Sequence, residues 1–287
     1  MAYRISQRLI WVVSGLATVT LVWVQSASAT IVAADEADNT PYNDGWQTGD
    51  NGGTGFGAWT LTQTSGSIDG FNGQFIGTSA NNGDGTTSPN IDTGGKAFGE
   101  YGNTGNAAVA YRAFGVGEMY NNSVFHFAMD NGDIDNGDSV GLTLRNGDAN
   151  ASPANYNTGA RFEFLFLGGN SDYEYIDSTG VHDSGIAFTS TGLQLSLRLI
   201  GTDQYTLTVS NGNSTALLGT YSGTLEGTAG SSIDSFAVFN NDAGSGGAHD
   251  AFFNSFSVDA VPEPTVVVLF VLGGGIIWAR RRHSRIA

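Results

Sequence analysis

The fold is constrained most by short runs in which apolar and polar residues alternate with a period of two. Residues 160–167 read ARFEFLFL, so three phenylalanines share one face while Arg161 and Glu163 share the other. Residues 193–199 read LQLSLRL, with four leucines on one face. Because successive side chains of a strand point to opposite faces, each run predicts a β-strand with one buried face.

Runs of this kind follow one another along the chain, separated by segments rich in glycine, asparagine and aspartate. The predicted strands cover residues 58–62, 107–114, 123–130, 139–146, 160–167, 193–199, 205–210, 233–240 and 251–259. No segment between them has a helical period. We expect roughly 10 to 14 short strands in one all-β domain, an antiparallel β-sandwich of the jelly-roll type. Trp46, which precedes the first run, is expected to cap the core, with contact to a ligand as the alternative.

The first 29 residues have the three parts of a secretory signal peptide. Arg4 and Arg8 precede an apolar stretch at 9–24, and the small-residue segment QSASA follows at 25–29. This order predicts a signal helix, export, and cleavage after Ala29. The alternative is an uncleaved N-terminal anchor.

The segment 261–287 combines prolines, an apolar run and a basic tail. Residues 265–279 are uncharged and mostly apolar, and Arg280, Arg281, Arg282 and Arg285 follow them. A helix of this length rises about 22 Å, short of the roughly 30 Å hydrocarbon core, and snorkelling arginines reduce the deficit. We expect a transmembrane helix with the arginines in the cytoplasm. The alternative, a buried core helix, is disfavoured by four arginines with no acid among them.

Pro262, Glu263 and Pro264, followed by this apolar run and the arginine tail, resemble the PEP-CTERM sorting signal of Gram-negative bacteria. The resemblance covers about a tenth of the chain. It implies that an exosortase-type enzyme removes the tail, after signal peptidase and the general secretion machinery have acted. The expected location is the cell surface or extracellular matrix, reached through a transient anchor in the inner membrane.

Residues 30–260, the expected ectodomain, are strongly acidic. They hold 26 Asp and Glu residues against Lys96 and four arginines, a net charge of −21. A surface of this charge repels nucleic acid and anionic lipid, so nucleic-acid binding is excluded. The chain has no cysteine, which excludes disulfides and thiol chemistry. The 231 residues of this region are enough to form a hydrophobic core without disulfides.

The succession of strands resembles the concanavalin A-like lectin and glucanase sandwich of many exported bacterial proteins. The segments that carry the resemblance are residues 110–114, 130–146, 161–164, 239–244 and 250–254. It implies a concave sheet face on which sugars bind. Related glucanases carry Glu-x-Asp-x-x-Glu on one strand, and nothing in this chain matches that spacing.

Polar residues opposite the apolar faces predict a single ligand-binding face. Together with Gln194 and Ser196, its expected members are His126, Arg145, Arg161, Glu163 and Arg198. Arginines on such a face would bind the carboxylates or sulfates of an extracellular polysaccharide through paired hydrogen bonds. The alternative is a solvated face whose arginines are neutralised by acids on neighbouring strands.

Four aspartates, Asp130, Asp133, Asp135 and Asp138, lie within nine residues of a glycine-containing loop. Carboxylate oxygens on a flexible loop are the ligands that Ca²⁺ prefers, so this loop is a candidate calcium site. The spacing is not that of an EF-hand. The alternative is an acidic hairpin loop, because Asn-Gly and Asp-Gly pairs form turns for reasons of backbone conformation alone.

No catalytic residues are predicted, because the histidines are scattered and no nucleophile motif is present. Three functions stay open. The sandwich is a polysaccharide-binding module, a structural matrix protein without a small ligand, or a glycan-active hydrolase.

Overall fold

The computed structural model describes residues 29–64, 71–83, 90–103, 105–115, 119–147 and 152–260, together with two short terminal strands. The chain divides into a compact unit at 28–262 and a terminal unit made of 1–27 and 263–287. In the terminal unit, β1 (Trp23–Val24) pairs antiparallel with β17 (Val266–Val267). The rest of the expected signal helix and transmembrane helix lies outside the described residues. Within the described residues, no helix has the length and apolar character needed to cross a membrane.

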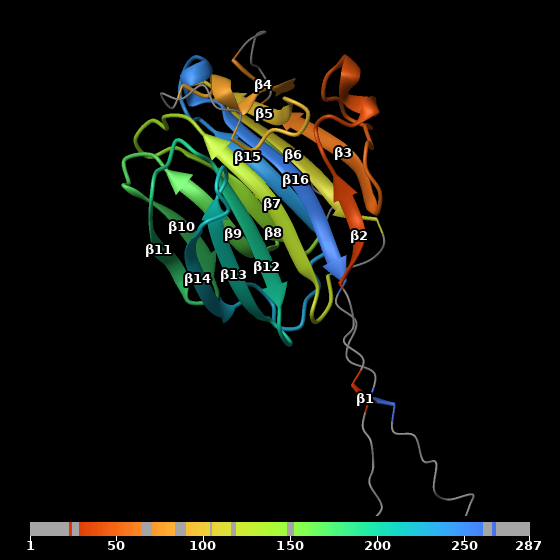
Figure 1. Ribbon diagram of the computed structural model, residues 1–287. Helices are drawn as coiled ribbons and strands as arrows, with labels where there is room; N and C mark the ends of the chain where they lie inside the picture. Colours follow the sequence, from red (N-terminus) through yellow and green to blue (C-terminus); the bar gives the residue numbers. More distant parts are fainter. Residues whose placement is uncertain are drawn as a thin grey trace, which may run out of the picture. The chain divides into compact units, whose positions relative to one another are not determined.

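The 28–262 unit is a sandwich of two antiparallel sheets packed face to face (Figure 1). The seven-stranded sheet has the order β11 (Gly180–Ala187), β10 (Asp172–Asp177), β9 (Ala160–Leu167), β8 (Ser139–Arg145), β15 (Ser235–Asn241), β6 (Ala107–Phe114) and β3 (Phe56–Gln63). The eight-stranded sheet has the order β14 (Leu217–Thr224), β13 (Gln204–Asn211), β12 (Leu193–Leu199), β7 (Val124–Asn131), β16 (Ala251–Ala260), β5 (Ala97–Gly102) and β4 (Asn72–Gly77), with β2 (Thr30–Asp35) also paired to β16. The predicted two-sheet antiparallel sandwich is therefore confirmed.

All nine predicted runs form strands, with bounds that differ by at most two residues at either end. Within the 28–262 unit, the strands that the alternation did not reveal are β2, β4, β5, β10, β11 and β14. Several of them are edge strands or glycine-rich, such as β14 with the sequence LLGTYSGT, which is half-exposed or exposed along its whole length. A strand that buries little surface needs no apolar alternation, so its sequence carries a weak signal. The helical elements are single 3₁₀ turns, η1 (Thr40–Asp44), η2 (Ser79–Asn81), η3 (Pro153–Asn155) and η4 (Gly247–His249).

The main hydrophobic core fills the space between the sheets, and all its buried members lie between residues 33 and 258. Its centre is aromatic: Phe236 of β15 contacts Phe125 of β7 and Phe256 of β16, with ring centroids 5.3 and 5.0 Å away. Trp46 is 4% exposed and meets Trp59 edge to face at 5.0 Å, so the predicted core cap is confirmed. Because it contains the whole core, the 28–262 unit has the elements needed to fold by itself.

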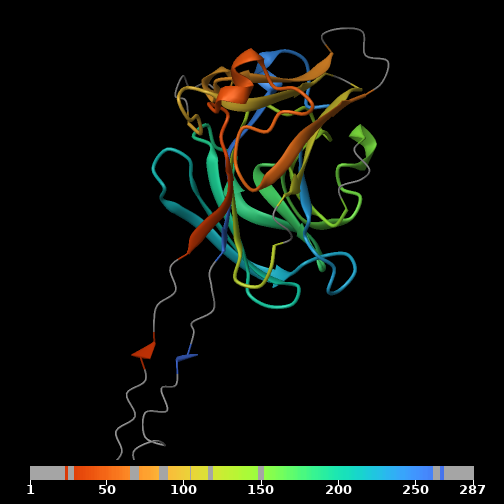
Figure 2. The same cartoon turned by 90° about the vertical axis from the view of Figure 1, so that its right-hand side faces the viewer.

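The segment between β2 and β3 folds over one end of the sandwich (Figure 2). Tyr42 of η1 packs edge-on against Phe98 of β5, with ring centroids 4.8 Å apart. The long strand β16 changes neighbour along its length, from β5 at its start to β2 at its end. A bulge lies between the two halves, where Ser255 has a φ of 53°. The bulge lets one strand pair with two partners in succession on the same side.

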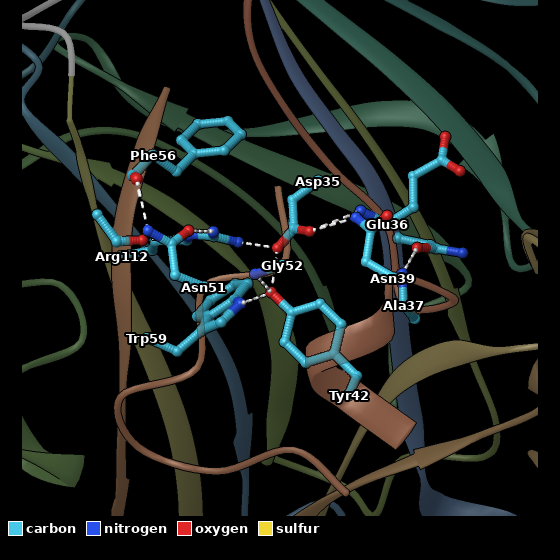
Figure 3. Close-up of polar contacts among 12 residues, drawn as sticks. Asp35, Glu36, Ala37, Asn39, Tyr42, Asn51, Gly52, Phe56, Trp59 and Arg112 are labelled. Atoms are coloured by element: carbon cyan, nitrogen blue, oxygen red, sulfur yellow. Dashed lines mark hydrogen bonds and ion pairs between the residues drawn. The ribbon is translucent and has the colours of Figure 1, made fainter. Parts of the chain in front are cut away.

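A buried ion pair joins β2 to β6. Asp35 and Arg112 are each 1% exposed and form an ion pair (Figure 3). Arg112 also donates two hydrogen bonds, from Nε to the Gly57 carbonyl at 2.9 Å and from Nη2 to Asn51 Oδ1 at 2.8 Å. Its guanidinium lies 4.7 Å from the centroid of the Trp59 ring. Tyr42 donates to the same Asp35 oxygen, and burial raises the pKa of Tyr42 to about 12, so the phenol keeps its proton. Every charged atom of this pair is thus partnered inside the protein, as burial of charge requires.

Candidate functional site

The five residues expected on one ligand-binding face lie on two different sheets. His126 on β7 and Arg198 on β12 belong to the eight-stranded sheet. Arg145 on β8, with Arg161 and Glu163 on β9, belongs to the seven-stranded sheet. The prediction of a single face is therefore wrong. Each sheet has its own outer face, and the alternation within a strand does not say which sheet the strand joins.

Arg145 is buried, because the segment around η3 covers this part of the seven-stranded sheet. Its Nε donates to the Thr158 carbonyl at 3.1 Å, and its guanidinium lies 4.7 Å from the centroid of the Tyr111 ring. Tyr156 stacks on Phe239 at 4.2 Å beside it. A face covered in this way offers Arg145 no direct contact with a large ligand.

Glu163 is 6% exposed and accepts a hydrogen bond from Thr143 Oγ1 at 3.2 Å. Burial, together with the nearby negative charge of Glu226, raises the pKa of Glu163 to about 7. Burial also raises the pKa of Glu226. Glycoside hydrolases pair one carboxyl of raised pKa with a second that stays ionised, whereas here the pKa values of both carboxyls are raised. Neither carboxyl lines either of the pockets described below, so the pair is not presented to a substrate there.

Arg161 is buried and holds together two segments at one end of the sandwich. Its Nη1 donates to the carbonyls of Glu226 and Thr228, the latter at 2.7 Å, and its Nη2 pairs with Asp203. Arg198 is exposed and donates from Nη2 to Asn122 Oδ1 at 3.0 Å. Both arginines therefore contact the turns that form a pocket at this end of the sandwich.

That pocket, which we call the loop pocket, has a volume of ≈ 440 Å³ and is built from three connections at one end of the sandwich. They are the β6–β7, β12–β13 and β14–β15 connections. Its floor is apolar and its rim is polar. The lining residues are Met119, Tyr120, Asn121, Leu199, Gly201, Thr202, Asp203, Leu225, Gly230, Ser231, Ser232 and Ile233.

The floor and the rim of the loop pocket differ in burial and chemistry. Met119, Leu199, Leu225 and Ile233 are buried and belong to the core. Tyr120 on the rim is 54% exposed. A rim of hydroxyl, amide and carboxylate groups beside an exposed aromatic ring suits a ligand that has both hydroxyl groups and an apolar face.

Hydrogen bonds fix the shape of the loop pocket. Asp203 pairs with Arg161 through one carboxylate oxygen and accepts the Gly230 N–H at 2.6 Å through the other, which ties two of the connections together. The third connection, β6–β7, is joined to the end of β12 by the Asn122 N–H, which donates to the Leu199 carbonyl at 2.8 Å. Arg161 and Arg198 thus act as positioning residues of this pocket. The two arginines could be singled out from the alternation of their strands. The other polar residues of the pocket could not, because they stand in turn segments with no periodic signal: Tyr120, Thr202, Asp203, Ser231 and Ser232.

His126 lies on the solvated outer face of the eight-stranded sheet, between Ser196 and Asp259. Its Nδ1 is 2.7 Å from Ser196 Oγ and its Nε2 is 3.4 Å from Asp259 Oδ2. These three residue types also form the triad of serine hydrolases. Here, however, β7 is paired on both sides, with β12 and β16, so its N–H groups are used in the sheet and are not free to stabilise an oxyanion. The trio is an interstrand contact rather than a site for acyl transfer.

The four aspartates of the candidate calcium loop do not converge. Asp130 is buried, with Oδ2 2.9 Å from the Asn90 amide nitrogen, whereas Asp133 and Asp135 are exposed. The backbone of this loop is held by the β15–β16 connection, since the Asp133 and Asp135 N–H groups donate to the carbonyls of Ala248 and Ala243. Within the residues that the structure describes, no three acidic or histidine side chains form a group that suits a metal ion. The geometry is that of the acidic hairpin loop.

Comparison with known proteins gives similarity of fold only. No family model and no curated protein matches the sequence. Among solved structures, a carbohydrate esterase from the Shiga toxin-encoding bacteriophage phi24B is 14% identical, with a TM-score of 0.47, over 82% of this chain and 100% of the other. Domain 4 of an extracellular arabinanase from Geobacillus stearothermophilus, solved with arabinotriose, is 13% identical, with a TM-score of 0.42, over 81% of this chain and 93% of the other. An endo-β-1,4-glucuronan lyase from the fungus Trichoderma reesei is 9% identical, with a TM-score of 0.37, over 70% of this chain and 93% of the other.

Proposed function

We propose that this protein is exported, sorted through its C-terminus, and binds an extracellular polysaccharide in the loop pocket without modifying it. In this proposal the sandwich is of the concanavalin A-like, jelly-roll type. The observation that carries the binding function is the loop pocket itself, in which Tyr120 and a rim of hydroxyl, amide and carboxylate groups surround a space of ≈ 440 Å³. A sugar ring has hydroxyl groups for such a rim and an apolar C–H face that stacks on an aromatic ring.

The charges around the loop pocket favour a neutral polysaccharide over an acidic one. Arg161 is 1% exposed, and its Nη1 and Nη2 atoms are already bonded to two carbonyls and to Asp203, so its guanidinium is not accessible to a ligand carboxylate. Asp203 itself lines the pocket. Residues 30–260 carry a net charge of −21, which repels polyanions. The sequence predicts that arginines bind acidic sugars through paired hydrogen bonds. We propose instead that hydroxyl and amide groups of the pocket bind a neutral sugar.

Substitution of Tyr120 by alanine is expected to weaken polysaccharide binding about 5- to 30-fold, the loss of roughly 1–2 kcal/mol of stacking energy. The measurement is thermal unfolding of the 28–262 unit with a panel of neutral and acidic polysaccharides, since a ligand of the folded state raises the midpoint. The matched control is Phe71→Ala, because Phe71 is also exposed, at 48%, but does not line the loop pocket.

The panel also separates the alternative functions. If no polysaccharide shifts the midpoint of the wild-type unit, the structural matrix protein replaces the binding module. If a polysaccharide is shortened during incubation and Glu163→Gln abolishes the shortening, the protein is a glycan-active hydrolase and not a binding module. A midpoint shift that survives in Tyr120→Ala would show that the ligand binds elsewhere.

Export and sorting rest on the sequence of the two chain ends. In a Gram-negative host with an exosortase-type enzyme, we expect the mature protein to begin at Thr30 and to lack the arginine tail. Mass spectrometry of the surface fraction measures both ends. Substitution of Pro262 and Pro264 by alanine is expected to leave the tail attached and the protein in the inner membrane. A mature surface protein that keeps residues 265–287 would contradict the sorting proposal.

A further inference from the structure

A second pocket lies at the other end of β15 from the loop pocket. Ser232 and Ile233, which precede β15, line the loop pocket, whereas Gly246, Gly247 and Asp250, which follow β15, line the second one. The seven residues of β15 separate the two pockets by about 20 Å along the strand. The remaining lining residues are Phe75, Tyr101 and Asn103, and the volume is ≈ 330 Å³. We call this the aromatic pocket.

Glycines on β4 and β5 let the two aromatic rings of this pocket lie flat on the sheet. Phe75 stands opposite Gly99, and Tyr101 stands opposite Gly73. A Cβ atom on Gly99 would overlap the Phe75 ring, and one on Gly73 would lie 2.9 Å from Tyr101 Oη. Each ring therefore covers the backbone of its cross-strand glycine. Phe75 and Tyr101 are both partly exposed, so ring surface faces the pocket.

Asp250 places a carboxyl group beside these rings without a cationic partner. The basic residues of 30–260, Lys96 and four arginines, all lie in the described part of the chain, and none of them forms an ion pair with Asp250 there. Nor does any described histidine. Burial raises the pKa of Asp250 to about 7. A partly buried carboxylate that lacks a counter-ion is unfavourable by itself, and a bound cation would compensate for that cost.

We propose that the aromatic pocket binds an organic ammonium ion, a protonated or quaternary amine on a compact body. The negative faces of Phe75 and Tyr101 attract the polarised C–H groups around the nitrogen, and Asp250 supplies the opposite charge. The strongly acidic surface raises the local concentration of cations. This site is separate from the loop pocket and does not depend on the proposed polysaccharide binding. Amino sugars and quaternary ammonium headgroups share this chemistry.

The test is isothermal titration of the 28–262 unit at pH 8, where Asp250 is mostly ionised, with choline and with its uncharged analogue 3,3-dimethyl-1-butanol. Choline is expected to bind at least about tenfold more tightly than the alcohol, since about 1.4 kcal/mol of charge interaction corresponds to a factor of ten. Asp250→Asn is expected to remove this preference, and Phe75→Leu, which keeps Gly99 covered, to weaken choline binding about 5- to 10-fold. A parallel titration at pH 7 compares glucosamine with the uncharged sugar glucose. Whether glucosamine or choline binds more tightly then shows whether the pocket prefers an amino sugar or a quaternary headgroup.

Controls keep this test independent of folding and of the loop pocket. Asp250→Asn resembles the protonated carboxyl, so its thermal midpoint at pH 8 is expected to be no lower than that of the wild type. Tyr120→Ala is expected to leave choline affinity unchanged, and Asp250→Asn to leave polysaccharide binding unchanged. The proposal is overturned if the alcohol binds as tightly as choline, if Asp250→Asn keeps the preference, or if choline does not bind at concentrations up to about 50 mM.

Discussion

Replacement of Arg112 by methionine is expected to lower the free energy of unfolding of the 28–262 unit by about 3–5 kcal/mol, the cost of removing one partner of a buried ion pair. The methionine fills much of the space between the Phe56 and Trp59 rings, so loss of packing contributes little. What remains is Asp35, 1% exposed, with a negative charge and no cation. Chemical denaturation monitored by tryptophan fluorescence measures the effect, because Trp59 lies against the substituted side chain.

Two variants test whether the charge of Asp35 is the cause. Arg198→Ala removes an exposed arginine that donates a hydrogen bond to Asn122 at the surface, and its effect on the free energy of unfolding is expected to stay within about 0.5 kcal/mol. The double variant Asp35→Leu with Arg112→Met removes both charges and is expected to be less destabilised than the sum of the two single variants. If the two single effects simply add, Asp35 and Arg112 are not coupled and the explanation is wrong.

A fall in pH from 8 to about 5.5 is expected to raise the free energy of unfolding by several kcal/mol. The folded-state pKa values of Glu163 and Asp250 are about 7, against 4.5 and 3.8 as ordinary values. Between those values the folded state binds more protons than the unfolded state, so protonation favours folding. The stabilisation begins as the pH falls through 7 and is complete near pH 4. Burial of Glu100 raises its pKa as well and acts in the same direction.

Glu163→Gln isolates the contribution of one carboxyl from the general loss of negative charge. At pH 8 this variant is expected to be more stable than the wild type by about 2–3 kcal/mol, because glutamine resembles the protonated acid that the buried site favours. At pH 4, below both pKa values of this carboxyl, the difference is expected to disappear. Asp133→Asn removes the same charge at an exposed position and is expected to leave both stabilities nearly unchanged. Equal effects of the two substitutions would assign the pH dependence to net charge instead.

The strands with strong alternation could be predicted from the sequence because each of them places a row of apolar side chains on the face that packs against the core. In β9 and β12 the apolar residues repeat at every second position, and the bounds agree residue for residue. The core position of Trp46 was also predictable, since a large ring among turn residues has few other places to be buried. The polar edge strand β14 was not, because it contributes little surface to the core and its exposed face tolerates many residue types.

The candidate sites depended on contacts between residues far apart in the chain. The sequence singled out Arg161 and Arg198, but it did not indicate that Arg161 would meet Asp203, 42 positions later, and so shape the loop pocket. The partner of Arg112 is 77 positions away, on a strand that the alternation did not reveal.

By itself, the sequence determined that the chain forms alternating strands around an apolar core, and that its expected ectodomain is acidic and free of cysteine. The tertiary structure decided which strands share a sheet, and so which polar residues come together. The physical reason is that side-chain alternation is a local property of one strand, whereas the neighbours of a strand are set by packing across the whole sandwich.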